Sequence, residues 1–388
     1  MKIAVIGSKG LPPKQGGIEH HCAEIYARMV EQGHTVELYG RSSYTQASWR
    51  EPCTYKGVNV RSIPSLPLRG LDALVTSAVA AIAASLAKND VIHFHALGPS
   101  LFSWIPRILS PHSKVVMTCH GLDWQRTKWG KISSTLIRLG EQIGTACSHE
   151  VVAVSKDLKP YFQQVYNRSV TYIGNGPAHY PDSDVNIEGV ESLGLQPQKY
   201  VLFLGRLVPE KCPHLLIQAF QSLRPLGWKL AIVGGTSDTS TYTSKLMRLA
   251  EHNPDIIFTG ELRGQRLANV VRCAGLFTLS SELEGLPLAL LEAMHEGVPV
   301  LTSDIPVHRE LVGGDRGQLF RVNDLSDFIT QMQWSMDHLP EMKHRATQAQ
   351  QYVIENYSWD TITTMLLNCY HSKDLVRPSA PITMTAPR

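Results

Sequence analysis

The sequence predicts an α/β protein made of two doubly wound domains. At 388 residues the chain is long for one hydrophobic core and suits two domains of ordinary size. Strand patterns alternate with helical patterns along its length, which is typical of parallel sheets covered by helices. We expect a first domain over residues 1–180, a second over 181–356, a final helix over 357–372 and a disordered, proline-rich tail over 373–388.

The amino-terminal stretch has the pattern of a strand, a loop and a helix. Residues 2–7 (Lys-Ile-Ala-Val-Ile-Gly) have the pattern of a buried strand, the loop ends at Gly16 and Gly17, and a helix is expected over 18–32. Glycines at the start of a helix let the backbone approach a phosphate closely. The loop lacks the third glycine of a dinucleotide fingerprint, and the chain has no Gly-x4-Gly-Lys-Ser/Thr motif. A plain dinucleotide-binding dehydrogenase and a P-loop enzyme are therefore disfavoured.

Two cations follow a second apolar strand, at residues 201–205. Arg206 comes directly after this strand, and Lys211 lies a few residues further on. The carboxyl end of a parallel strand is where open α/β sheets bind their ligands. An arginine fork and a lysine point charge together suit a diphosphate. The alternative interpretation is a surface salt bridge with Glu210.

Glu284 and Glu292 flank the start of a helix that is expected between strands at 274–279 and 298–302. Pro287 fits the first turn of this helix, and Gly297 fits its end. Glu292 then lies inside the helix, while Glu284 lies in the loop at its mouth beside unbonded amides. This arrangement suits an anionic ligand that bears hydroxyl groups. The alternative is a pair of glutamates on a solvated helix face.

Together these motifs resemble retaining glycosyltransferases of family 4. The motifs that carry the resemblance are Gly16-Gly17, Gly205-Arg206 with Lys211, and Glu284-x7-Glu292. Further stretches fit the same family: His93-x-His95, Thr118-Cys119-His120-Gly121, Tyr172 to Gly176, and Ser358-Trp359-Asp360. The resemblance implies a GT-B fold, in which two Rossmann-like domains face each other across a cleft and the C-terminal helix crosses back to the N-terminal domain.

The resemblance also implies the roles of individual residues toward a nucleoside-diphosphate sugar. Arg206 and Lys211 would hold the diphosphate, Glu292 would accept hydrogen bonds from the ribose, and His120 and Glu284 would contact the sugar. Gly16 and Gly17 would complete the phosphate cradle. The catalytic set is then His120, Glu284, Arg206 and Lys211.

One departure from the family affects the loop before the helix. Many relatives have Glu-Gly-Phe-Gly where this chain has Glu284-Gly285-Leu286-Pro287. Pro287 has no amide to donate, so Gly285 and the amides of Leu286 and Leu288 are expected to serve as donor-binding groups. No metal or other cofactor is expected, because the histidine motifs His20-His21 and His93-x-His95 have no accompanying carboxylate set.

The implied function is the retaining transfer of a sugar to a glycan or lipid-linked acceptor, in cell-envelope or exopolysaccharide biosynthesis. UDP is favoured over GDP as the nucleotide of the donor. Residues 120–130 resemble a subgroup of bacterial envelope-polysaccharide enzymes. Two alternatives stay open: a nucleotide-sugar epimerase of the same GT-B architecture, and a non-catalytic, membrane-associated protein that binds nucleotide sugars.

Positive net charge concentrates in the first domain, where residues 1–180 hold 19 Lys and Arg against 11 Asp and Glu. A basic half favours an anionic partner, and we expect a lipid surface or lipid-linked phosphate rather than nucleic acid. Tryptophans and cations typical of an interfacial helix gather in one stretch: Trp124, Arg126, Lys128, Trp129 and Lys131. The alternative is a surface helix with two half-buried tryptophans. We expect a cytoplasmic protein that makes peripheral contact with the inner face of the plasma membrane.

Overall fold

The computed structural model describes residues 1–14, 16–45, 48–64, 71–125, 129–181, 184–235 and 240–372. The chain folds into two compact units, the first built from Met1–Asn175 and the segment that begins at Trp359, the second from Gly176–Ser358. The chain thus returns to the first unit for its last helix, as the fold class predicted. The division lies a few residues before the expected boundary at residue 180. The expected tail, residues 373–388, lies outside the described residues.

The first unit is built on an eight-stranded sheet with the order β3-β4-β2-β1-β5-β6-β7-β8. Neighbouring strands pair in parallel except for the antiparallel pair of β3 and β4. The strands are β1 Lys2–Ile6, β2 Thr35–Arg41, β3 Cys53–Tyr55, β4 Val58–Ile63, β5 Val91–His95, β6 Lys114–Cys119, β7 Glu150–Ala153 and β8 Thr171–Tyr172.

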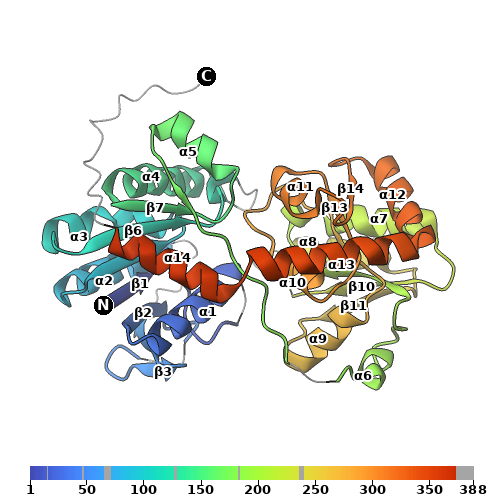
Figure 1. Ribbon diagram of the computed structural model, residues 1–388, viewed down its shortest axis with the longest axis horizontal. Helices are drawn as coiled ribbons and strands as arrows, with labels where there is room; N and C mark the ends of the chain where they lie inside the picture. The colour runs from blue at the N-terminus through green and yellow to red at the C-terminus, as the bar shows by residue number, and fades with distance from the viewer. Residues whose placement is uncertain are drawn as a thin grey trace. The chain divides into compact units, whose positions relative to one another are not determined.

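Helices cover both faces of this sheet (Figure 1). They are α1 Gly17–Glu31, α2 Leu71–Leu86, α3 Trp104–Leu109, α4 Lys131–Cys147, α5 Leu158–Tyr166 and α14 Trp359–His371. Strand β1 is buried on both sides because its side chains alternate between two cores. Ile3 and Val5 pack with α1 and α14, while Ala4 and Ile6 pack with α2. A continuous apolar strand, rather than an alternating one, is the sequence mark of such a position.

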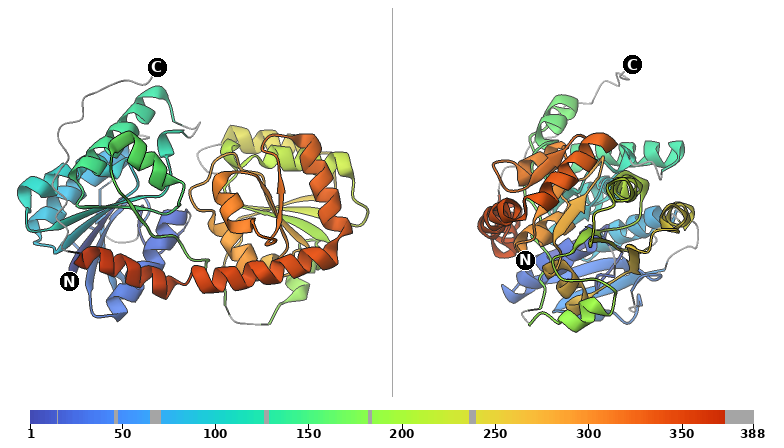
Figure 2. Two further views of the ribbon diagram at one scale, coloured as in Figure 1. Left: turned by 45° about the horizontal axis from the view of Figure 1, so that its top comes forward. Right: turned by 90° about the vertical axis from the view of Figure 1, so that its right-hand side faces the viewer.

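The second unit is built on a six-stranded, wholly parallel sheet with the order β11-β10-β9-β12-β13-β14. Helices surround this sheet on both faces, as Figure 2 shows. The strands are β9 Tyr200–Leu204, β10 Lys229–Val233, β11 Ile256–Gly260, β12 Leu276–Leu279, β13 Val300–Ser303 and β14 Gln318–Phe320. The helices are α6 Ile187–Glu191, α7 Pro213–Leu223, α8 Ser240–Ala250, α9 Gly264–Arg272, α10 Leu288–His295, α11 Pro306–Val312, α12 Leu325–Asp337 and α13 Leu339–Asn356.

Each sheet has one point at which the direction of winding reverses. In the second unit the chain runs from β9 outward to β10 and β11 and then returns to place β12 on the other side of β9. In the first unit it runs from β1 outward to β2 and β4 and returns to place β5 beside β1. Ligands of open α/β sheets bind beyond the carboxyl ends of the strands at such points. The fold therefore predicts one ligand-binding site in each unit, at the point where its winding reverses.

Candidate active site

The site of the second unit lies where β9 and β12 end side by side. The segment after β9 carries Arg206 and Lys211, and the segment after β12 carries Glu284. The two segments are joined through the backbone, since the amide of Glu282 donates to the carbonyl of Glu210 over 2.9 Å. Arg206, Lys211 and Glu284, which the sequence analysis predicted to bind the donor, therefore lie at the same edge of the sheet.

Lys211 and Glu284 form a largely buried ion pair. The Lys211 Nζ donates to Glu284 Oε1 over 2.6 Å, and the side chains are only 14% and 12% exposed. The Ser281 hydroxyl donates to the same carboxylate oxygen over 2.7 Å. Burial by itself raises the pKa of Glu284, but the Lys211 charge and these hydrogen bonds outweigh it and hold that pKa below its usual value. The surface salt bridge to Glu210, considered as an alternative, is thus replaced by a buried pair to Glu284.

Arg206 follows β9 directly and is half-buried. Within the described ranges, its guanidinium makes no hydrogen bond or ion pair with another side chain. Arginine is seldom buried, even in part, without a partner for its five N–H donors. An anion that reaches this edge of the sheet would therefore find donors that the fold itself does not use.

Helix α10 adds backbone donors to the same edge. Its first intrahelical bonds run from the amides of Leu290 and Leu291 to the carbonyl of Pro287. The amide of Leu288 comes before these bonds, at the positive end of the helix dipole. Pro287 itself is the residue before the helix and not part of its first turn, which corrects the expectation by one position. Its φ of −78° suits either place, so the sequence pattern did not separate them.

Glu292 lies inside α10, but a tyrosine already contacts it. The Tyr180 hydroxyl donates to Glu292 Oε2 over 2.7 Å. Burial raises the pKa of Glu292 above its usual value, although the bonds from Tyr180 and from the backbone of Ala178 act in the opposite direction. An ionised carboxylate offers about four lone-pair sites, so Glu292 can accept further hydrogen bonds. The solvated helix face, the alternative for this glutamate, does not describe a half-buried carboxylate that a buried tyrosine already contacts.

Gly16 and Gly17 lie at the start of α1, as expected. The helix begins at Gly17, and Gly16 precedes it with φ of +100°, a conformation that favours glycine. Sequence reasoning missed the buried Glu19 in the first turn. Its Oε1 accepts a hydrogen bond from the amide of Lys9 over 3.0 Å, and its Oε2 lies 2.3 Å from where a Cβ on Gly16 would stand. Glu19 thus holds the loop after β1 against the helix, and its carboxylate would have to move to admit a side chain at residue 16.

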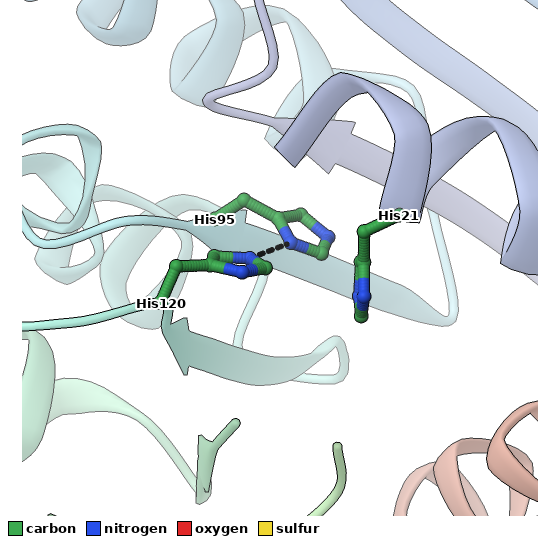
Figure 3. Close-up of side chains that lie close together, drawn as sticks. All are labelled: His21, His95 and His120. Atoms are coloured by element: carbon green, nitrogen blue, oxygen red, sulfur yellow. Dashed lines mark hydrogen bonds between the residues drawn. The ribbon is translucent and has the colours of Figure 1, made fainter. Parts of the chain in front are cut away.

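His120 lies just beyond β6 and contacts a second histidine at the end of β5. The distance from His120 Nε2 to His95 Nδ1 is 3.0 Å, and Figure 3 shows the two rings side by side. The other nitrogen of His95, Nε2, lies 2.6 Å from the Tyr26 hydroxyl of α1. Tyr26 also lies 2.9 Å from His93 Nδ1. His120 is therefore the outer end of a hydrogen-bonded chain that runs into the core of the first unit.

The donors and acceptors of this chain are coupled. Burial lowers the pKa of His95 well below its usual value, so its ring is neutral and carries one proton. If Tyr26 donates to His95 Nε2, then His95 Nδ1 must donate to His120. If His120 donates to His95, then His95 donates to Tyr26, whose proton turns toward His93 or Tyr370. The protonated nitrogen of His120 is therefore set by the direction of a buried hydroxyl.

The stretch expected to meet a membrane is only partly described, because Arg126 and Lys128 lie outside the described residues. Trp124 is half-buried and donates through Nε1 to the buried Glu141 over 2.8 Å, and Trp129 is also half-buried. The alternative of a surface helix with two half-buried tryptophans thus fits these two side chains. Lys131 is exposed at the start of α4. Among the described helices, none combines the length and apolar character that crossing a bilayer requires.

Several partners in these sites were not nominated from the sequence. Tyr26, Tyr180 and Ser281 look like ordinary core or loop residues in the sequence. The roles of Tyr26 and Tyr180 depend on contacts between segments far apart in the chain, whereas Ser281 bonds to Glu284 within its own loop. His95 was noted only within a family motif. The sequence did contain a signal for Tyr26. A tyrosine on the buried face of a helix needs a partner for its hydroxyl, and the His93-x-His95 motif offers ring nitrogens for that purpose.

Comparison with known families gives two matches, one for each unit. Residues 15–177 match the family described as Glycosyltransferase Family 4, and residues 189–352 match the family described as Glycosyl transferases group 1. The two matches do not overlap and together span most of the chain. They divide it close to the boundary between the two units.

Curated relatives match the chain over almost its whole length. An uncharacterized glycosyltransferase of Methanocaldococcus jannaschii is 25% identical over 95% of this chain and 98% of the relative. A D-inositol 3-phosphate glycosyltransferase of Rhodococcus erythropolis is 26% identical over 92% of this chain and 86% of its own. A GDP-mannose-dependent alpha-(1-6)-phosphatidylinositol monomannoside mannosyltransferase of Mycobacterium tuberculosis is 25% identical over 97% of this chain and 100% of the relative.

Solved structures share the fold at lower identity. A sucrose-phosphate synthase from Thermosynechococcus elongatus superimposes with a TM-score of 0.80 at 18% identity, over 95% of this chain and 98% of that one. HepE of Anabaena, solved with UDP and glucose, gives a TM-score of 0.76 at 19% identity, over 95% of this chain and 99% of that one. With its two doubly wound parallel sheets and a family match on each unit, the chain belongs to glycosyltransferase family 4 and has the GT-B fold.

Proposed function

We propose that the protein is a retaining glycosyltransferase that moves a sugar from a nucleoside-diphosphate sugar to a glycan or lipid-linked acceptor, in the synthesis of cell-envelope or exported polysaccharide. The names of its relatives support a nucleotide-sugar donor, since one is GDP-mannose-dependent and one structural neighbour was solved with UDP-glucose. They differ in the nucleotide, so the mild preference for UDP over GDP rests on the frequency of UDP-sugars as donors alone. The mycobacterial relative acts on a phosphatidylinositol glycolipid, which supports a lipid-linked acceptor.

The observation that carries the proposal is the set of unused donors at the edge where β9 and β12 end. The Arg206 guanidinium has no partner among the described residues, and the amide of Leu288 opens α10. A diphosphate satisfies both, because it is anionic, accepts many hydrogen bonds and suits a helix N-terminus. Gly285 and Leu286, in the loop just before α10, supply further backbone there.

The ion pair between Lys211 and Glu284 gives each residue a defined orientation before the donor arrives. A lysine ammonium has three donors, so Lys211 can keep its bond to Glu284 and still donate to a phosphate oxygen. Glu284 in turn keeps lone pairs for the hydroxyl groups of the sugar. The ion pair therefore orients Lys211 toward the phosphate and Glu284 toward the sugar at the same time. Neither charge is left unpaired in the free protein.

The chemistry depends on stabilising a departing diphosphate. As the glycosidic bond breaks, negative charge grows on the leaving oxygen, and Arg206 and Lys211 stabilise that charge more strongly than they bind the ground state. These cations supply the role that a metal ion has in other phosphate sites, and we propose that the transfer needs no metal. The incoming hydroxyl attacks on the face from which the diphosphate leaves and passes its proton to the departing phosphate oxygen, and attack on this face retains the anomeric configuration.

The first unit is proposed to supply the remaining groups. His120 contacts the transferred sugar, with the protonated nitrogen set by His95 and Tyr26. Gly16 and Gly17 present backbone to the diphosphate at the start of α1. The exposed Lys131, together with the 80% exposed Ile132 beside it on α4, supports a peripheral contact with an anionic lipid surface.

A panel of nucleotide sugars tests the proposal. The donor is first identified by thermal shift, because a ligand of the folded state raises the apparent melting temperature. NMR then follows the sugar in two incubations, one with donor alone and one with a lipid or glycan extract. The proposal expects transfer only when acceptor is present, with the anomeric configuration of the donor kept in the product. Conversion of the donor alone to an epimer would identify an epimerase, and binding without turnover would identify a non-catalytic protein.

A further inference from the structure

We infer that His21, His95 and His120 form a binding site for a divalent transition-metal ion such as Zn²⁺, at the winding reversal of the first unit. One ring nitrogen from each residue lies within 4.8 Å of those of the other two. The three side chains come from separate elements: α1, the end of β5 and the segment after β6 (Figure 3). Among the described residues this is the one group of three or more His, Cys, Asp or Glu side chains with such spacing.

His21 is the residue whose arrangement a purely structural role does not explain. Its Nδ1 lies 2.5 Å from the carbonyl oxygen of the Asn175 side chain, which can only accept, so Nδ1 carries the proton. Its Nε2 therefore holds a lone pair. That nitrogen is buried and has no hydrogen-bond donor within the described residues, and the residue as a whole is only 2% exposed. A buried acceptor left without a partner is costly, and a bound cation satisfies it.

His95 and His120 already stand at the spacing of two metal ligands. Their facing nitrogens, Nδ1 and Nε2, are 3.0 Å apart. The nitrogens of a tetrahedral zinc site, each about 2.0–2.1 Å from the ion, stand about 3.3 Å apart. One nitrogen of each ring lies within 4.8 Å of those of the other two, so the three rings have to approach one another by about 1.5 Å at most to reach this spacing. Ring rotation of the half-buried His120 and a small shift of His21 can supply that movement.

The proton shared by His95 and His120 does not prevent metal binding. When both facing nitrogens bind the ion, His95 carries its proton on Nε2 and donates it to the Tyr26 hydroxyl, and Tyr26 donates to His93. This rearrangement moves protons within the buried chain, so His95 binds the cation without releasing one. Asn175 and Tyr26 then act as the outer partners that orient His21 and His95.

Burial keeps two of the ligands neutral at physiological pH. It lowers the pKa of His21 to about 4, against the opposing bond to Asn175, and lowers that of His95 well below its usual value. Metal binding requires neutral imidazole, and imidazole nitrogens suit Zn²⁺, Co²⁺, Ni²⁺ and Cu²⁺. Three histidines leave a fourth position of a tetrahedral ion open, for water or an anionic ligand.

This site goes beyond the proposed function, in which the transfer needs no metal. An ion held by His120 would take that side chain from the sugar, so the metal acts as an inhibitor of transfer. The binding experiment uses neither donor nor acceptor, and it therefore succeeds or fails independently of the proposed reaction.

The test is a Co²⁺ titration of the full chain without a histidine tag, with Zn²⁺ as competitor. We expect one Co²⁺ per chain, with the intense visible absorption of four-coordinate cobalt, and its displacement by Zn²⁺. His21→Gln removes a ligand and is expected to weaken binding by more than about 100-fold, while Asn175→Ala removes an outer partner and costs about 10- to 100-fold. The matched control is His20→Gln, because His20 is the exposed neighbour on the same helix and its loss should leave the affinity unchanged.

The variants are first checked for folding by circular dichroism, and Asn175→Ala serves alone if His21→Gln does not fold. Zn²⁺ should also raise the melting temperature of the parent and of His20→Gln more than that of Asn175→Ala. The inference is overturned if the parent binds no stoichiometric metal, or if the bound cobalt shows the weak spectrum of a six-coordinate ion. It is equally overturned if His21→Gln or Asn175→Ala binds Co²⁺ as tightly as the parent does.

Discussion

Replacing Lys211 with methionine should destabilise the second unit through Glu284 rather than through lost packing. Methionine keeps an unbranched side chain of similar length, so the space over Gly205 that the lysine carbons occupy stays filled. What changes is the charge beside Glu284, whose side chain is only 12% exposed. The carboxylate keeps one hydrogen bond, from Ser281. It then has to be buried as an unpaired anion or take up a proton.

The size of the effect follows from the geometry of the pair. At the observed 2.6 Å separation and an effective dielectric constant of about 20, the attraction between the two charges is about 6 kcal/mol. Removing two ions from water offsets much of this, but removal of one partner leaves the other uncompensated and costs about 3–5 kcal/mol. The double variant Lys211→Met with Glu284→Gln carries no charge at either position and should lose less than Lys211→Met alone.

The pH dependence gives an independent check with a definite sign. In the parent the pKa of Glu284 is lowered by folding, so the pair stabilises the protein above the unfolded pKa and this contribution is lost as the pH falls through the folded value. In Lys211→Met the buried carboxyl has a raised pKa and becomes neutral as the pH falls. The loss in unfolding free energy should therefore be larger at neutral pH than at about pH 4, close to the ordinary pKa of a glutamate.

Urea unfolding measures these differences, with hydrogen exchange in β9 and β12 assigning the transition to the second unit. Arg309→Met is the matched control, because Arg309 and Asp304 approach to 2.8 Å in the same unit while their side chains are 59% and 35% exposed. That exposed pair should contribute far less than the buried one. Equal losses for the two variants, or a loss for Lys211→Met that does not change with pH, would refute the reasoning.

Three further variants and one binding assay test other parts of the account. Arg206→Ala should lower kcat/KM by the equivalent of about 2–4 kcal/mol in steady-state assays, with little change in the free energy of unfolding. The control Arg248→Ala, at an exposed position, should alter neither quantity. Turnover by Arg206→Ala at the rate of the parent would contradict the role of Arg206. Glu292→Gln should weaken donor binding in calorimetry more than it slows the reaction, and unchanged affinity would reject contact with the ribose. Gly16→Ala should cost about 1–3 kcal/mol in urea unfolding, because φ is positive and Glu19 occupies the space; a melt like that of the parent would show that the loop adapts. Vesicle flotation should increase with anionic lipid and fall with added salt, and indifference to lipid charge would exclude the membrane contact through α4.

The fold was predictable because its signals are local and repeated. Continuous apolar strands followed by amphipathic helices indicate parallel sheets wherever they occur, and the structure has both sheets. Boundaries were less certain, as Pro287 shows, because proline tolerates both the first helical position and the one before it. The glycines at the start of α1 were recognisable because few other residues accept the backbone conformation of Gly16.

The partners of the nominated residues were not predictable in the same way. The sequence assigned Lys211 to a phosphate and Glu284 to a sugar, and it did not indicate that the two bind each other across 73 positions of chain. The same holds for Glu292 with Tyr180, and for His120, whose neighbours come from β5 and α1. A charged residue in a motif indicates that a partner exists, but only the packing of distant segments decides which partner it has.

The most direct test of the central claim is a crystal structure with the nucleoside diphosphate that stabilises the protein most. We expect phosphate oxygens within hydrogen-bonding distance of the Arg206 guanidinium and of an amide at the start of α10, with Lys211 still in contact with Glu284. A diphosphate bound at any other edge of the sheet, with Arg206 left without an anion, would exclude a donor site at the ends of β9 and β12.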